Sequence, residues 1–171
     1  MKGKVFLVLF VSLFIIGCAS VPKLPADTKF SVTSLKVNLK QKLTVEGYPA
    51  QAEFSEIFKK SFIESLKEKN LLADSGAGNA MSVTLNIDYT RQFAGEDTPF
   101  PSKSVMAPKV NYTLVVTDKG VEKNRISNAG VLNKGFLGSL KTMGLANDPK
   151  SELSDIKKVT DSIANDLNAM K

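Results

Sequence analysis

The sequence of 171 residues contains no histidine, no tryptophan and a single cysteine. Without histidine, the chain lacks the side chain that most often serves in acid–base catalysis and metal ligation at neutral pH. One cysteine alone excludes an internal disulfide. The remaining composition, 43% hydrophobic and 23% charged residues, is that of an ordinary globular protein, and the length fits one domain.

Arginine is also scarce. Arg91 and Arg125 are the only arginines, although lysine and arginine together number 23 and the formal net charge is +6. Specific recognition of phosphates and bases favours the planar, bidentate guanidinium of arginine over the point charge of lysine. We therefore expect no nucleic acid partner. The lysine excess indicates a soluble surface, or a weak attraction to anionic lipid or glycan.

The first 20 residues contain the parts of a secretory signal peptide in their usual order, and they read MKGKVFLVLFVSLFIIGCAS. Lys2 and Lys4 form a positive start, and residues 5–16 form a hydrophobic run that only Ser12 interrupts. Such a run is too short for the ~30 Å hydrocarbon core of a bilayer, which needs about 20 residues. The pattern therefore predicts a signal peptide rather than a membrane-spanning helix.

The residues Ile15-Ile16-Gly17-Cys18 resemble the bacterial lipobox. The resemblance implies cleavage between Gly17 and Cys18, a diacylglycerol group on the Cys18 thiol, an acyl chain on its new amino group and no other cofactor. Ala19 follows in place of an aspartate, which in lipoproteins of enteric type implies the outer membrane, with the domain facing the periplasm. Two acyl chains make such an anchor effectively permanent. The alternative is a plain signal or an uncleaved anchor, with Cys18 present by chance.

The expected organisation has three parts: a signal peptide at residues 1–17, a lipidated cysteine and tether at 18–29, and a single α+β domain at 30–171. The tether contains Pro22 and Pro25 and has no apolar period. From Cys18 to Thr28 it reaches at most ~40 Å when extended. We therefore expect the domain to stay close to the membrane that holds it.

Two stretches have the period of an amphipathic helix. Residues 50–70 place apolar side chains four apart on one face, and this stripe consists of Phe54, Phe58, Phe62 and Leu66. The second helix starts at Pro149, which suits the first helical position, with Asp148 as the N-cap. Its expected stripe consists of Leu153, Ile156, Val159, Ile163, Leu167 and Met170.

Four stretches alternate as strands do. They are residues 30–39, where a phase change at Ser34 indicates a bulge, and residues 81–93, 110–116 and 121–127. Asp118-Lys119-Gly120 predicts a hairpin turn between the last two strands. The predicted fold class is α+β, a mainly antiparallel sheet of about four strands with two amphipathic helices packed on one face, in the order β-α-β-β-β-α. Residues 128–147 contain several glycines and predict no definite element.

This order of parts resembles a group of small outer-membrane lipoproteins: a lipobox, a short tether with prolines, a strand, an amphipathic helix, a glycine-rich break, and alternating strands before a last helix. The group includes YajG-like proteins, the LptE-like component of lipopolysaccharide transport and the periplasmic activators of peptidoglycan synthases. The resemblance covers most of residues 30–170. It implies partner binding on a small α/β platform rather than catalysis, and it transfers no functional residue, because it rests on element order and apolar pattern.

Two segments combine apolar side chains with proline or glycine. Residues 94–108, AGEDTPFPSKSVMAP, form a long loop that contains Phe100 and Met106 among prolines. Residues 131–145 contain Phe136 among glycines. If exposed, Phe100, Met106 and Phe136 are candidate contacts for a partner. The alternatives are that residues 94–108 cap the open end of the core and that residues 131–145 are an irregular strand and turn.

No combination of nucleophile, base and orienting residue is visible. Ser-x-x-Lys occurs at Ser20–Lys23 and Ser154–Lys157, about as often as chance predicts, without the other parts of a penicillin-binding site. Asp88, Glu96 and Asp97 lack the spacing of a calcium loop, and we expect them to be solvated. We therefore predict no catalytic residue, no metal site and no enzyme activity.

The expected function is that of a non-enzymatic, membrane-anchored lipoprotein that binds another cell-envelope component, a protein partner or complex subunit, near the outer membrane. The alternative is a carrier or sensor of a lipid or glycolipid held between sheet and helices. In that case Phe54, Phe58 and Phe62 would line its cavity. A continuous apolar pocket would support the carrier, and a close-packed interior would remove it.

The lipobox yields the first testable prediction. Replacing Cys18 with alanine removes the only thiol that can be acylated. Because acylation precedes cleavage in lipoproteins of this type, we expect the Cys18→Ala chain to retain residues 1–17 and to carry no acyl mass. Mass spectrometry of the amino-terminal peptide measures both properties. Ala19→Ser is the matched control and should be processed normally, while an unmodified thiol in the wild-type chain would contradict the lipid anchor.

Overall fold

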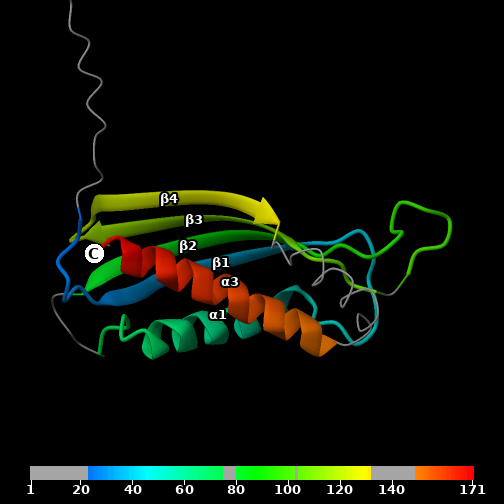
Figure 1. Cartoon of the computed structure of the whole chain (residues 1–171), viewed down its shortest axis with the longest axis horizontal. Coiled ribbons are helices and arrows are strands. Elements are labelled where there is room, and N and C mark those ends of the chain that lie inside the picture. The colour runs from blue at the N-terminus through cyan, green and yellow to red at the C-terminus, as the bar shows by residue number, and fades with distance from the viewer. Residues whose placement is uncertain (1–22, 75–79, 103, 132–148) are drawn as a thin grey trace, which may run out of the picture.

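The computed structural model describes residues 23–74, 80–102, 104–131 and 149–171. These residues form β1 (Phe30–Lys40), α1 (Gln51–Glu68), β2 (Met81–Thr90), β3 (Lys109–Asp118), β4 (Val121–Val131) and α3 (Pro149–Ala169). The four strands make a sheet in the order β1-β2-β3-β4, and both helices lie on one of its faces (Figure 1). The α+β class and the element order predicted from the sequence are confirmed.

The sheet is mixed. β1 and β2, which are connected through α1, run parallel, whereas β2 with β3 and β3 with β4 run antiparallel. The register of β1 against β2 shifts between Val32 and Ser34, which confirms the predicted bulge. Lys119 and Gly120 have φ angles of 49° and 83°, and positive φ at both positions is what a two-residue hairpin turn requires. The predicted turn between β3 and β4 is therefore also confirmed.

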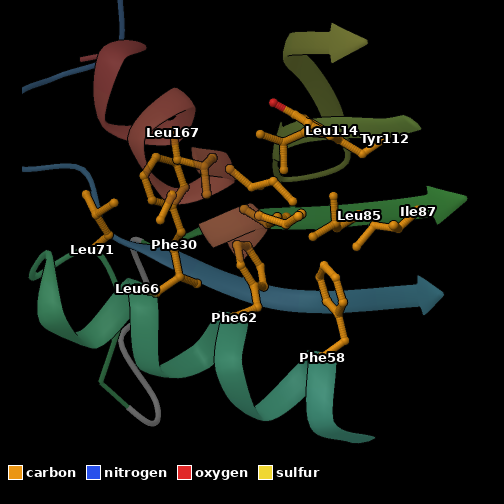
Figure 2. Close-up of a cluster of buried hydrophobic side chains, with 14 of the residues drawn as sticks. Phe30, Phe58, Phe62, Leu66, Leu71, Leu85, Ile87, Tyr112, Leu114 and Leu167 are labelled. Atoms are coloured by element: carbon orange, nitrogen blue, oxygen red, sulfur yellow. The ribbon is translucent and has the colours of Figure 1, made fainter. Parts of the chain in front are cut away.

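The core lies between the helices and the sheet, and Figure 2 shows the rings of Phe58 and Phe62 directed from α1 toward the strands. The whole predicted stripe of α1 is fully buried, namely Phe54, Phe58, Phe62 and Leu66. The inward-facing positions of β2 and β3 are also buried, namely Val83, Leu85, Ile87, Tyr89, Val110, Tyr112, Leu114 and Val116. One alternating phase of each strand thus packs against one stripe of the helix, as the sequence pattern predicts.

α3 covers the remaining part of this face. It begins at Pro149 as predicted, while Asp148 lies outside the described residues. Most of its predicted stripe is buried, namely Ile156, Val159, Ile163, Leu167 and Met170. The prediction for Leu153 is wrong, because its side chain is 45% exposed and Glu152 is buried instead. The physical reason is a buried guanidinium, that of Arg91, which requires a carboxylate at this point of the helix.

The end of α1 is fixed to the start of β1. Asn70 has a left-handed φ of 55°, and the N–H groups of Asn70 and Leu71 return to the carbonyls of Lys67 and Leu66 at 2.9 and 2.8 Å. This is the Schellman arrangement, which satisfies the last carbonyls of a helix. Leu71 O in turn accepts a hydrogen bond from Phe30 N–H at 2.8 Å. The helix therefore ends where the first strand begins.

The outer edge of β1 is occupied near both of its ends. The side-chain amide of Gln51 accepts from Leu39 N–H and donates to Val37 O, both at 2.7 Å. At the other end of the strand, Ala73 N–H donates to Phe30 O at 2.9 Å. Because a bare strand edge is a template for pairing with another chain, these bonds protect this side of the sheet.

The chain enters and leaves the domain at the same end of the sheet. Leu24 is buried in the core, and its N–H donates to Met170 O at 2.7 Å. Figure 1 shows the start of β1 and the end of α3 at this end, and residues 94–108 at the opposite end. Within the described ranges, no helix has the length and apolar character needed to cross a membrane.

The packing of α1 can be tested at Phe62, whose side chain is fully buried. Phe62→Ala removes a ring and leaves a cavity, so we expect the free energy of unfolding to fall by about 3–5 kcal/mol. Lys59→Ala, on the exposed face of the same helix, is the matched control and should change it by less than about 0.5 kcal/mol. Urea unfolding measures both, and equal losses would contradict this packing.

Candidate functional site

The loop between β2 and β3, residues 91–108, is the candidate functional site. Three backbone hydrogen bonds join its two arms: Ala94 N–H to Ser104 O at 2.9 Å, Ser102 N–H to Ala94 O at 2.8 Å, and Met106 N–H to Gln92 O at 2.8 Å. Phe93 and Val105 pair across the arms and are both buried. The base of the loop is therefore a short, ordered extension of the sheet.

The tip of the loop is held by local bonds. The N–H and the hydroxyl of Thr98 donate to Gly95 O at 2.8 and 2.7 Å. Gly95 has a φ of +72°, and a Cβ at that position would lie 3.1 Å from Thr98 Oγ1, so the turn favours glycine there. Phe100 N–H donates to Thr98 Oγ1 at 3.3 Å. Pro99 and Pro101 fix φ on either side of Phe100, which places this residue on a preorganised turn.

The structure exposes two of the three candidate contact residues. The side chain of Phe100 is 89% exposed and that of Met106 is 48% exposed. These two residues do not cap the core, because both side chains are exposed. The third candidate, Phe136, lies outside the described residues, as do Gly17 and Cys18.

Two acidic residues, Glu96 and Asp97, form hydrogen bonds that stabilise the loop. The prediction that Glu96 is solvated is wrong: its side chain is 9% exposed, and Oε2 accepts the N–H of Phe93 at 3.0 Å. Asp97 is exposed as predicted and contacts Lys42 Nζ at 2.5 Å, and this hydrogen bond raises the pKa of Lys42. The loop is thus linked to the segment that follows β1.

Arg91 is buried at the base of the loop, and each of its three side-chain nitrogens donates a hydrogen bond. Its Nε and Nη2 donate to the two carboxylate oxygens of Glu152, at 2.7 and 2.8 Å. Nη1 donates to Gln41 Oε1 at 2.5 Å, and Nη2 also donates to Pro49 O at 3.0 Å. One side chain therefore joins the end of β2 to α3, to the segment after β1 and to the approach to α1.

Aromatic rings surround this ion pair. The guanidinium carbon of Arg91 lies 5.4 Å from the ring centre of Tyr48 and 5.5 Å from that of Phe54. Tyr48 meets Phe93 edge-on at 5.8 Å, which links the pair to the base of the loop. Burial, with a further contribution from the Glu152 carboxylate, raises the pKa of Tyr89 well above its ordinary value. Sequence reasoning missed this centre, although Arg91 continues the inward phase of β2.

The lysine of the second Ser-x-x-Lys segment is paired with two carboxylates. In the second Ser-x-x-Lys segment, Lys157 Nζ contacts Asp161 at 2.5 Å and Glu68 at 2.7 Å, and these hydrogen bonds raise its pKa. A raised pKa keeps the amine protonated, the opposite of what a general base requires. Within the described part of the chain, no cluster of three or more His, Cys, Asp or Glu residues could hold a metal ion.

Two hollows lie away from the loop. One of about 370 Å³ is on the sheet face that carries no helix, and one of about 270 Å³ lies where the end of α3 approaches β4. Neither is lined by Phe54, Phe58 or Phe62, the residues expected to line the cavity of a carrier. These three rings have no surface accessible to water, so they contact protein atoms only.

The sequence matches no family model and no curated protein. Among solved structures, the chain is similar to the crystal structure of protein XCC0632 from Xanthomonas campestris, of the family DUF330. The two chains are 9% identical, the TM-score is 0.41, and the match covers 90% of this chain and 93% of that chain. The similarity is thus to a bacterial protein, and it transfers no functional residue.

The Arg91–Glu152 pair yields a prediction on stability. Glu152→Ala leaves a buried, unpaired guanidinium, and we expect the free energy of unfolding to fall by about 3–5 kcal/mol. Arg91→Met combined with Glu152→Leu should be markedly more stable than Glu152→Ala alone, since neither charge remains. Urea unfolding of the single and double variants measures the coupling.

The exposed pair Glu122–Arg125, whose nearest atoms are also 2.7 Å apart, is the matched control. Glu122→Ala should leave the unfolding midpoint almost unchanged, because exposed ion pairs contribute little. Equal shifts in Glu122→Ala and Glu152→Ala would contradict the special role of the buried pair.

Proposed function

We propose that this protein is a lipid-anchored protein of the bacterial cell envelope that binds another envelope component, a protein partner or complex subunit, through the loop at residues 91–108. In this proposal Cys18 carries the diacylglycerol group and the second acyl chain, the anchor lies in the outer membrane and the domain faces the periplasm. The lipobox residues Ile15–Cys18 support the anchor. The geometry of the loop supports the binding surface.

The position of the tether supports a contact surface at the far end of the domain. Leu24 already belongs to the core, so only residues 18–23 separate the acylated position from the folded domain. Six residues reach at most about 20 Å when extended. β1 has 11 residues and spans roughly 35 Å, and the loop lies beyond its far end (Figure 1). An anchor at Cys18 would therefore hold the near end at the membrane and leave the loop available to a partner.

The observation that carries the proposal is the exposure of Phe100 between two prolines on a hydrogen-bonded turn. A large apolar side chain on an ordered turn is a suitable interface anchor, because it buries substantial area and loses little conformational freedom on binding. Met106, on the returning arm of the same loop, adds further exposed apolar surface. The partner expected here is a protein with an apolar pocket that accepts a phenylalanine ring.

The proposal predicts a position-specific cross-link. With p-benzoylphenylalanine in place of Phe100 in the full-length lipoprotein, irradiation of cells should give one defined protein adduct. Val121, 59% exposed in the turn region between β3 and β4 at the opposite end, is the matched control position and should not give this adduct. Equal adducts at both positions, or an adduct with lipid alone, would contradict the proposal.

A substitution tests the energetic importance of the ring. Phe100→Ser should weaken co-purification of the cross-linked partner by about tenfold or more, as expected when a central anchor is removed. Because the ring is exposed, the unfolding midpoint should not change. Val121→Ser should affect neither measurement, and a partner retained at full strength by Phe100→Ser would place the interface elsewhere.

A further inference from the structure

The sheet face that carries no helix contains a second candidate site, separate from the loop at residues 91–108. The strand register places short side chains in two adjacent rows across β2, β3 and β4, namely Asn86–Thr113–Ser127 and Asp88–Asn111–Ala129. The hollow of about 370 Å³ lies over these six residues and borders Tyr112 and Asn128. We refer to it as the polar groove.

We propose that the polar groove binds an uncharged saccharide chain, such as an envelope glycan strand. The side chains of Asn86 and Asn111 are exposed and make no hydrogen bond with the described residues. Each amide offers both an N–H donor and a carbonyl acceptor, and the hydroxyls of Thr113 and Ser127 lie 3.5 Å apart beside them. A chain of sugar hydroxyls needs donors and acceptors at this close spacing.

Charge on the groove disfavours an anionic ligand. Among the described residues, no lysine or arginine lines the groove itself, and Lys40 of the neighbouring strand is paired with Asp88 at 2.8 Å, so a phosphate or sulfate inside the groove would lie against a carboxylate. Asp88 accepts hydrogen bonds from Lys40 Nζ at 2.8 Å and from Asn38 Nδ2 at 3.0 Å, and these bonds lower the pKa of Asp88. The carboxylate therefore stays negative at neutral pH and can still accept hydrogen bonds from hydroxyls.

The amides of Asn86 and Asn111 also disfavour a wholly apolar ligand. Covering Asn86 and Asn111 with hydrocarbon would leave their amides without hydrogen bonds, which is costly. The hollow lies where the residues of β4 opposite Thr113 and Asn111 are small, namely Ser127 and Ala129. Its volume lies near the lower end of the range for ligand sites, about 300–1,000 Å³, so it accommodates a short stretch of a longer chain.

The test uses the full-length lipoprotein in a detergent without sugar groups and chitotetraose, an uncharged oligosaccharide, as the probe. Titration calorimetry should show saturable binding. Replacing both Asn86 and Asn111 with alanine should weaken that binding by about tenfold or more, since several hydrogen bonds are lost. Ser82→Ala, which also alters a polar side chain of β2 but lies outside the groove, is the matched control and should bind within about twofold of wild type.

A second variant tests the shape of the groove without removing a hydrogen-bonding group. Ala129→Leu fills the hollow and should abolish binding while the unfolding midpoint stays close to that of wild type, because residue 129 is exposed. Absence of saturable binding by the wild-type chain, or an equal loss in Ser82→Ala, would overturn the proposal. So would p-benzoylphenylalanine at position 86 that captures a polypeptide and no glycan, since this face would then be a protein interface.

Discussion

The burial of one guanidinium is the constraint on which the far end of the domain depends. An unpaired Arg91 in the interior would cost several kcal/mol, so the folded chain must bring a carboxylate and further acceptors to it. Glu152, Gln41 and Pro49 supply them from three separate segments. Satisfying one side chain thereby fixes the start of α3 against the end of β2. The loop that exposes Phe100 begins at Arg91 and therefore has a rigid base.

Much of the fold could be predicted because each helix or strand that buries one face has apolar residues at a regular spacing in the sequence. The phenylalanines of α1 recur every four residues, and the residues of β2 alternate strictly between apolar and polar. These two patterns identify the helix face and the strand face that form the same core. Two local features could also be predicted from the sequence. The phase change at Ser34 corresponds to a bulge, and Lys119-Gly120 forms a turn with positive φ angles. In β2 the alternation has a second consequence, since its other phase forms the polar side of the sheet.

Contacts between distant residues could not be predicted in this way. Arg91 and Glu152 are 61 positions apart, and the search for an apolar stripe in α3 selected Leu153 because it did not admit a charged residue to the core. The alternation of apolar and polar residues within β1 and within β2 does not indicate that the two strands pair in parallel. The burial of Glu96 depends on how the loop returns past Phe93, which only the folded chain defines. Exposure of Phe100 likewise followed from the loop geometry, and the sequence left it open.

The hydrogen bonds of the Gln51 amide to the outer edge of β1 affect how two copies of the domain could associate through their sheets. Under the proposed lipid anchor, these domains would meet one another at high local density on a bilayer surface, where sheets with two free edges could add side by side into fibrils. Here the bonds of Gln51 and of Ala73 already occupy backbone groups near both ends of β1, so an incoming strand could pair only with the stretch between them. A single glutamine side chain thereby shortens the edge through which one domain could add to another.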